Sequence, residues 1–152
     1  MIRFIASWFG TGLILGRLRG DPAGSGTVGS LFALPVVLAV GRYLGSGGQI
    51  GLFVVTTALS VWVSGQLANT EGDAPWIVVD EAAGVSLTLI GVFAWPGVMA
   101  GFVVFRLADI FKGAFPGVAA ADRLGSGVGI TADDLVAGLY GLAVGHLVQF
   151  LI

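Results

Sequence analysis

Four long apolar stretches leave this chain little freedom in what it can fold into. They cover residues 28–44, 50–67, 82–107 and 135–152, and a shorter apolar run at 2–15, which we expect to be retained, precedes them. A membrane-crossing helix needs about 20 mostly apolar residues, because it rises about 1.5 Å per residue. Backbone groups in hydrocarbon must bond within their own segment, so these stretches should be helices. The sequence therefore predicts an all-α, polytopic membrane bundle.

Charged side chains are too scarce to give the chain a water-exposed surface. They make up 11% of the 152 residues, against about 25% in ordinary globular domains. Seven basic residues and a net charge of −2 exclude a nucleic-acid partner, and the absence of cysteine excludes a disulfide scaffold. We expect a single integral-membrane domain over residues 1–152, with the oligomeric state left open.

The third stretch is too long for one upright helix. Residues 82–111 would form a helix of about 45 Å, and Trp95-Pro96-Gly97 lies in its middle. It could be one kinked span or two short helices folded into a hairpin; we favour the hairpin, with Trp95-Pro96-Gly97 at its tip and about four to five membrane helices in all. The hairpin also brings most Lys and Arg residues to one face, which the positive-inside rule makes cytoplasmic.

Carboxylates gather at the ends of the predicted helices rather than in their middles. Helix capping is a sufficient explanation for some of them, and Thr131 with Asp134 has the spacing of a capping box. Asp109 is different, because the dipole at a helix C-terminus disfavours an anion and requires Arg106, Lys112 or a metal nearby. Carboxylates without His or Cys suit Mg²⁺ and similar hard cations. The candidate catalytic and metal-binding residues are Asp80, Glu81, Asp109, Asp133 and Asp134.

Basic and hydroxyl side chains beside these carboxylates predict a phosphate site. Carboxylates that hold a hard metal, next to cations, can offset the charge of a phosphoryl group. The glycine-rich run 24–30 can present backbone N–H groups to an anion, although a linker with a helix cap explains it equally well. The single histidine, His146, is expected to pack or hydrogen-bond within the bundle. The candidate phosphate-binding residues are Thr27, Ser30, Arg106, Lys112 and Arg123.

Five segments resemble the bacterial phosphatidylglycerophosphatase A family, and they occur in the order seen there. They are Gly10-Thr11-Gly12-Leu13, Gly26-Thr27-Val28-Gly29-Ser30-Leu31, Ile77-Val78-Val79-Asp80-Glu81, Phe105-Arg106-Leu107-Ala108-Asp109 with Lys112, and Gly127-Val128-Gly129-Ile130 followed by Asp133-Asp134. The resemblance implies a Mg²⁺-dependent lipid phosphatase of the bacterial inner membrane. Such an enzyme removes the terminal phosphate of phosphatidylglycerophosphate and yields phosphatidylglycerol.

Two other classes of protein remain open at this point. The carboxylates could line the ion path of a small transporter, or the chain could be a membrane scaffold with capped helices. A transporter is expected to place acids near mid-membrane, whereas here they lie at predicted helix ends. For a phosphatase, the attacking group is either a metal-activated water, which we favour, or a carboxylate that forms an aspartyl-phosphate.

Overall fold

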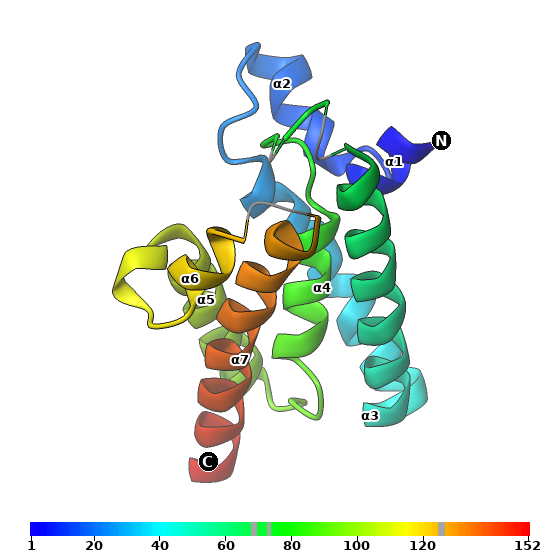
Figure 1. Cartoon of the computed structure of the whole chain (residues 1–152). Helices are drawn as coiled ribbons and strands as arrows, with labels where there is room; N and C mark the ends of the chain where they lie inside the picture. Colours follow the sequence, from blue (N-terminus) through cyan, green and yellow to red (C-terminus); the bar gives the residue numbers. More distant parts are fainter. Residues whose placement is uncertain (68–69, 73, 125–126) are drawn as a thin grey trace.

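The computed structural model describes residues 1–67, 70–72, 74–124 and 127–152, and within these ranges every regular element is helical. The predicted all-α fold is therefore confirmed (Figure 1). The elements in chain order are α1 (Ile2–Ala6), η1 (Thr11–Leu13), α2 (Ile14–Arg19), α3 (Ser25–Leu67), α4 (Val79–Thr88), α5 (Trp95–Ile110), η2 (Lys112–Ala114), α6 (Val118–Asp122) and α7 (Gly127–Leu151).

Helix α3 is a hairpin rather than one straight rod. Gly45 interrupts it with φ 64° and ψ −164°, a conformation that glycine adopts without a side-chain clash. The chain reverses there, and a Cβ on Gly41 would lie 2.6 Å from the Gln49 side chain on the returning half. The two halves correspond to the apolar stretches 28–44 and 50–67 expected from the sequence.

Helices α4 and α5 form the second hairpin, which confirms that residues 82–111 fold back on themselves. The turn comprises residues 89–94 and lies at the end of the bundle where α7 finishes (Figure 1). The prediction that Trp95-Pro96-Gly97 forms the tip of this hairpin is wrong. These residues form the first turn of α5. Proline is favoured at that position because the first N–H groups of a helix have no partner within it.

Helix α4 is the centre of the bundle. Nine of its ten residues are buried, and it packs against α3, α5 and α7. The exception is Glu81, which is half-buried. A helix buried on all sides requires close neighbours, and a Cβ on Gly84 would lie 2.5 Å from the Phe105 ring. Glycine at this position lets α5 approach α4.

Polar side chains from α3 and α7 hold the turn at 89–94. Gln49 accepts a hydrogen bond from the Gly91 N–H at 2.9 Å, and Gln149 accepts from the N–H groups of Phe93 and Ala94 at 2.6 and 2.9 Å. The Nε2 atom of His146 lies 2.8 Å from the Ile90 carbonyl oxygen, as expected for a histidine bonded within the bundle. These bonds satisfy backbone groups that an apolar environment would otherwise leave unpaired.

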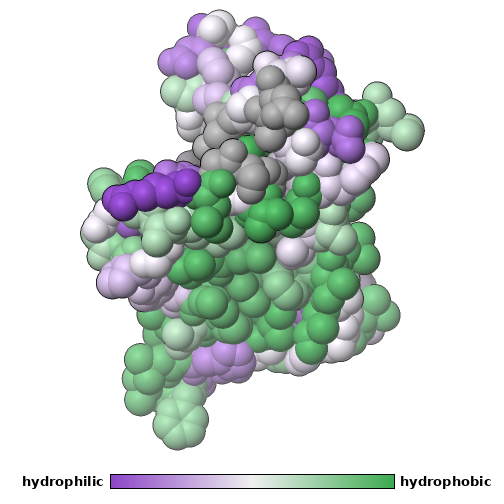
Figure 2. All heavy atoms as spheres, viewed as in Figure 1, coloured by the Kyte–Doolittle hydropathy of each residue, from purple (hydrophilic) through white to green (hydrophobic). Residues whose placement is uncertain are grey.

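Two helices, Ser25–Leu67 and Val128–Leu151, are long and apolar enough to cross a membrane. Figure 2 shows apolar side chains over the middle and lower part of the viewed face, while hydrophilic ones gather at the end that carries α1 and α2. The expected number of four to five membrane helices stays a prediction.

Glycines spaced four residues apart bring α5 and α7 into direct backbone contact. A Cβ on Gly97 would lie 2.7 Å from the Gly145 carbonyl oxygen, and a Cβ on Gly101 would lie 2.9 Å from that of Gly141. Small residues at this spacing allow membrane helices to approach closely. The expected packing role of these two glycine pairs is confirmed.

We expect Gly141→Ala to destabilise the protein, because the new Cβ would lie 2.7 Å from the Gly101 carbonyl oxygen. Overpacking of this kind costs about 1–3 kcal/mol. Gly51→Ala is the matched control, since nothing lies within 4 Å of its Cβ and alanine favours a helix by up to about 1 kcal/mol. Thermal unfolding in detergent should give a lower Tm for the first variant and an unchanged or higher Tm for the second. Equal shifts would contradict the close α5–α7 contact.

Candidate active site

A cavity of about 460 Å³ lies where α4 and α7 begin and α5 ends. Its walls come from segments far apart in the sequence: the start of α3, residues 74–77, and the ends of α4, α5 and α7 that face it. Of the ten predicted site residues, those that line the cavity are Thr27, Asp80, Glu81, Arg106, Asp109, Lys112, Asp133 and Asp134.

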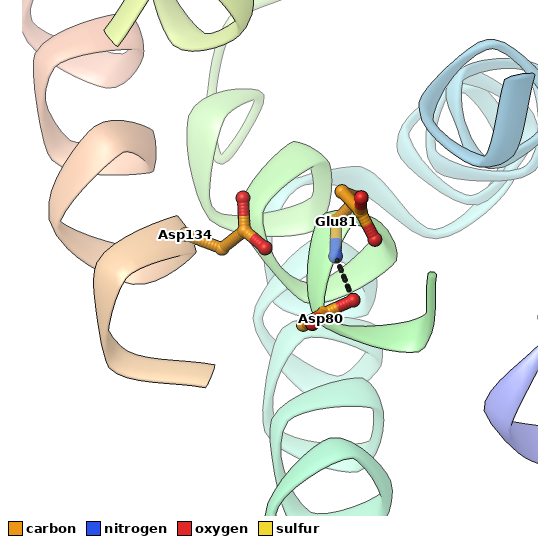
Figure 3. A group of neighbouring side chains, drawn as sticks. All are labelled: Asp80, Glu81 and Asp134. Carbon is orange, nitrogen blue, oxygen red and sulfur yellow. Dashed lines mark hydrogen bonds between the residues drawn. The ribbon is translucent and has the colours of Figure 1, made fainter. Parts of the chain in front are cut away.

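Three carboxylates meet in this cavity. Asp80 and Glu81 belong to the first turn of α4, Asp134 comes from α7, and one oxygen of each lies within 4.8 Å of the others (Figure 3). Glu81 Oε2 and Asp134 Oδ1 are buried and have no hydrogen-bond partner among the described residues. Buried carboxylates are stable only with a proton or a cation close by. The three oxygens therefore fit a hard divalent cation, whose ligands are oxygen atoms.

Helix capping does not account for this cluster. Asp80 Oδ1 accepts the N–H of its own neighbour Glu81 at 3.0 Å, and Asp133 Oδ1 accepts that of Asp134 at 3.0 Å. Both acids also line the cavity, where Asp133 Oδ2 pairs with Lys112. The capping box expected at Thr131 is wrong, because α7 already begins at Gly127. The Thr131 hydroxyl instead lies 2.7 Å from that of Ser60 on α3.

Arg106 connects α5 to the start of α3. Its side chain is buried, forms a 2.8 Å ion pair with Asp109, and donates hydrogen bonds to Ser30 Oγ at 3.0 Å and Thr27 Oγ1 at 3.3 Å. This ion pair supplies the cation expected beside Asp109 at the C-terminal end of α5. Arg106 Nε is buried without a partner among the described residues, so the guanidinium keeps a donor for a further ligand. Ser30 supports the site through Arg106 and does not line the cavity.

Lys112, which also lines the cavity, bridges two acids. Its Nζ pairs with Asp133 and lies 2.7 Å from Asp122 Oδ1 on α6. Burial acts to lower the pKa of Lys112, but hydrogen bonds and charge from Asp122 and Asp133 outweigh it and raise that pKa. The hydrogen bond from Lys112 in turn lowers the pKa of Asp122. Arg123, the fifth predicted phosphate-binding residue, is exposed at the end of α6 and does not line the cavity.

Two features of the site were not among the predicted site residues: Asp122, which pairs with Lys112 outside the cavity lining, and Gly26. Asp122 follows Lys112 by ten residues, and only the return of the chain through α6 brings them together. Gly26, in the first turn of α3, lies directly beneath Glu81, since a Cβ there would be 2.1 Å from Glu81 Oε1. The glycine-rich run was the available signal for Gly26; nothing in the spacing pointed to Asp122.

The fold and the cavity define a helical protein whose acid- and cation-lined site is suited to a divalent cation and a phosphorylated ligand. The model of the family described as Phosphatidylglycerophosphatase A matches residues 4–149, and the chain belongs to that family. It is therefore a phosphatase, and the family resemblance found in the sequence is confirmed. No solved structure matches the chain.

Curated relatives agree with this assignment. The chain is 31% identical to the phosphatidylglycerophosphatase A of Haemophilus influenzae (98% of this chain, 89% of the relative) and 34% identical to that of Escherichia coli (89% and 76%). It is also 32% identical to a Bacteroides thetaiotaomicron protein named "Putative phosphatidylinositol-3-phosphatase" (90% and 86%). All three names describe phosphatases that act on a phosphorylated lipid headgroup.

We expect Gly26→Ala to reduce activity by about 10- to 100-fold, the range seen when a group supporting a metal ligand is lost. The added methyl group would displace the Glu81 carboxylate, whose Oε1 lies 2.1 Å from the Cβ position. Because that carboxylate is the flexible end of a side chain, the fold should persist. Phosphate release and Tm should be measured together, with Gly47→Ala as control, since nothing lies within 4 Å of its Cβ. Full activity in Gly26→Ala would contradict a role for the Glu81 carboxylate.

Proposed function

We propose that this protein is a Mg²⁺-dependent phosphatase that removes the terminal phosphate from phosphatidylglycerophosphate and releases phosphatidylglycerol. One observation carries the proposal: three carboxylates, two with unpartnered buried oxygens, share a cavity with Arg106 and Lys112. Family membership supports this substrate. The differently named Bacteroides relative shares its chemistry, the hydrolysis of a lipid phosphomonoester.

The five acids divide into two groups by their partners. Asp80, Glu81 and Asp134 would hold Mg²⁺, because their oxygens converge. Asp109 and Asp133 are each paired with a cationic side chain, so they would position Arg106 and Lys112 rather than bind the metal. Bound Mg²⁺ would supply charge neutralisation at the phosphoryl group and lower the pKa of a water molecule.

Arg106 and Lys112 would both bind the phosphate, because both side chains line the cavity. The guanidinium has planar, paired donors that match phosphate oxygens, and Thr27 and Ser30 fix its orientation. A water oxygen then attacks phosphorus, its proton passes to a cavity carboxylate, and the ester P–O bond breaks. The departing glycerol oxygen takes up a proton, which completes the hydrolysis.

We further propose that the bundle crosses the bacterial inner membrane several times, with the cavity at the cytoplasmic face. The turn at 89–94 lies at the opposite end of the bundle (Figure 1). Most basic residues belong to segments at the cavity end, which agrees with the positive-inside rule. The acids lie together at one end and do not form a path along the bundle, so an ion-transport function is not favoured.

Metal removal gives the first test of this proposal. We expect EDTA to abolish phosphate release from phosphatidylglycerophosphate vesicles and Mg²⁺ to restore it. Asp134→Asn should lower activity by roughly 100-fold or more. This loss is larger than the loss expected when a residue that only hydrogen-bonds to a metal ligand is replaced. Without Mg²⁺ the same variant should unfold at an equal or higher temperature, since it relieves repulsion among buried carboxylates. Activity that survives both EDTA and Asp134→Asn would refute the metal site.

The attacking group can be identified by trapping. If water attacks phosphorus, acid quenching during turnover of ³²P-labelled substrate should leave no label on the protein. A hydroxylamine-labile phosphoprotein would instead identify an aspartyl-phosphate and show that the water mechanism is wrong.

A further inference from the structure

The catalytic cavity has an apolar edge. Ile110, in the last turn of α5, lines the cavity although it is 56% exposed, and Thr27 lines it from α3 and is exposed as well. Arg106 reaches between them and donates a hydrogen bond to Thr27. The cavity therefore opens to the outside of the bundle between α3 and α5.

Exposed apolar side chains continue from this opening along both helices. Leu31 follows Thr27 by four residues on α3, while Leu107 and Val103 precede Ile110 by three and seven residues on α5, spacings that keep each set on one helix face. Leu31 is 51% exposed and Val103 is 48% exposed. Over the described residues α5 packs closely on α7 but shares almost no close backbone contact with α3. We call these five residues the α3–α5 seam.

A second apolar groove, between Pro116 and α7, does not join the cavity. This α6–α7 groove has a volume of about 340 Å³, and none of its lining residues lines the cavity. The Tyr140 hydroxyl donates to the Pro116 carbonyl oxygen at 2.9 Å across it. Lys112, bound to Asp122 and Asp133, closes the cavity wall on the α6 side. The groove lining is Pro116, Val136, Leu139, Tyr140 and Ala143.

We propose that the lipid substrate enters the cavity sideways through the α3–α5 seam, with its phosphate at Arg106 and an acyl chain against Leu31, Val103 and Leu107. A phosphate that arrives from water would require the chains to leave the bilayer, which exposes their apolar surface. A lateral opening at headgroup level avoids this. The inference rests on the proposed function, because it requires a substrate anchored in the membrane.

Photolabelling tests where the acyl chain lies. The probe is a phosphonate analogue of phosphatidylglycerophosphate, which is not hydrolysed, with a diazirine in one acyl chain, in phosphatidylethanolamine vesicles. Excess unlabelled analogue should suppress labelling of residues 28–38 and 99–110. Such competition separates a specific site from general lipid contact. Suppressible labelling of residues 136–143, or no suppressible labelling above background, would overturn the proposal that the lipid enters through the α3–α5 seam. This result does not depend on turnover.

A matched pair of variants tests the same inference by kinetics. Leu31→Trp fills the seam, whereas Leu139→Trp changes an equally exposed leucine (51% and 53%) in the α6–α7 groove. We expect kcat/KM for phosphatidylglycerophosphate in vesicles to fall at least tenfold in the first variant and less than twofold in the second, with both Tm values near wild type. If the wild type releases no phosphate, the proposed function is wrong, and the photolabelling experiment alone then tests the seam proposal. If the wild type is active and the two variants behave alike, or Leu139→Trp is the slower, the seam proposal is wrong.

Discussion

Burial of three mutually repelling carboxylates at one end of a helical bundle is the constraint on which the other features of the structure depend. Asp80 and Asp134 are each only 4% exposed, and their oxygens meet Glu81 within 4.8 Å. Without opposite charge, such a group would favour protonation or unfolding. The two flanking cations, Arg106 and Lys112, are each held by other acids, so they lower the local negative charge without neutralising the central cluster. That residual negative charge is the feature on which the proposed Mg²⁺ site rests.

Placing those carboxylates requires a central helix that can be enclosed from all sides. Glycines meet this need where two backbones approach: Gly84 beneath Phe105, and Gly101 against Gly141. A side chain at Gly84 would press on Phe105 of α5, and one at Gly101 would press on the backbone of α7. The polar turn at 89–94 completes the arrangement at the far end, where Gln49 and Gln149 bind its backbone. Close glycine contacts and this bonded turn together hold α4 between its neighbours.

Much of this arrangement could be predicted from the sequence, because membrane helices are signalled by local composition. The fold-back of residues 82–111 and the meeting of the acids with Arg106 and Lys112 follow from stretch lengths and charge positions, and the packing role of the two glycine pairs follows from their spacing. The position of Trp95-Pro96-Gly97 could not be predicted in this way, because proline occurs both at a break between helices and in the first turn of a helix. The pairing of Lys112 with Asp122 and the contact of Gly26 with Glu81 depend on the path of the chain through space, which spacing alone does not encode.

The charged residues and the apolar wall of the cavity would contact different parts of a lipid headgroup. This separation bears on why relatives with similar sequences carry names for different lipids. In the proposed mechanism every charged residue of the cavity acts on the phosphate end: Asp80, Glu81 and Asp134 would hold Mg²⁺, and Asp109 and Asp133 would position Arg106 and Lys112. The wall formed by Ala74, Pro75 and Ile77 is apolar and offers few hydrogen-bonding side chains to the rest of a headgroup. The proposed mechanism therefore places its demands on the phosphomonoester. The rest of a headgroup would meet this apolar wall, whose shape rather than its hydrogen bonds would set which headgroups fit.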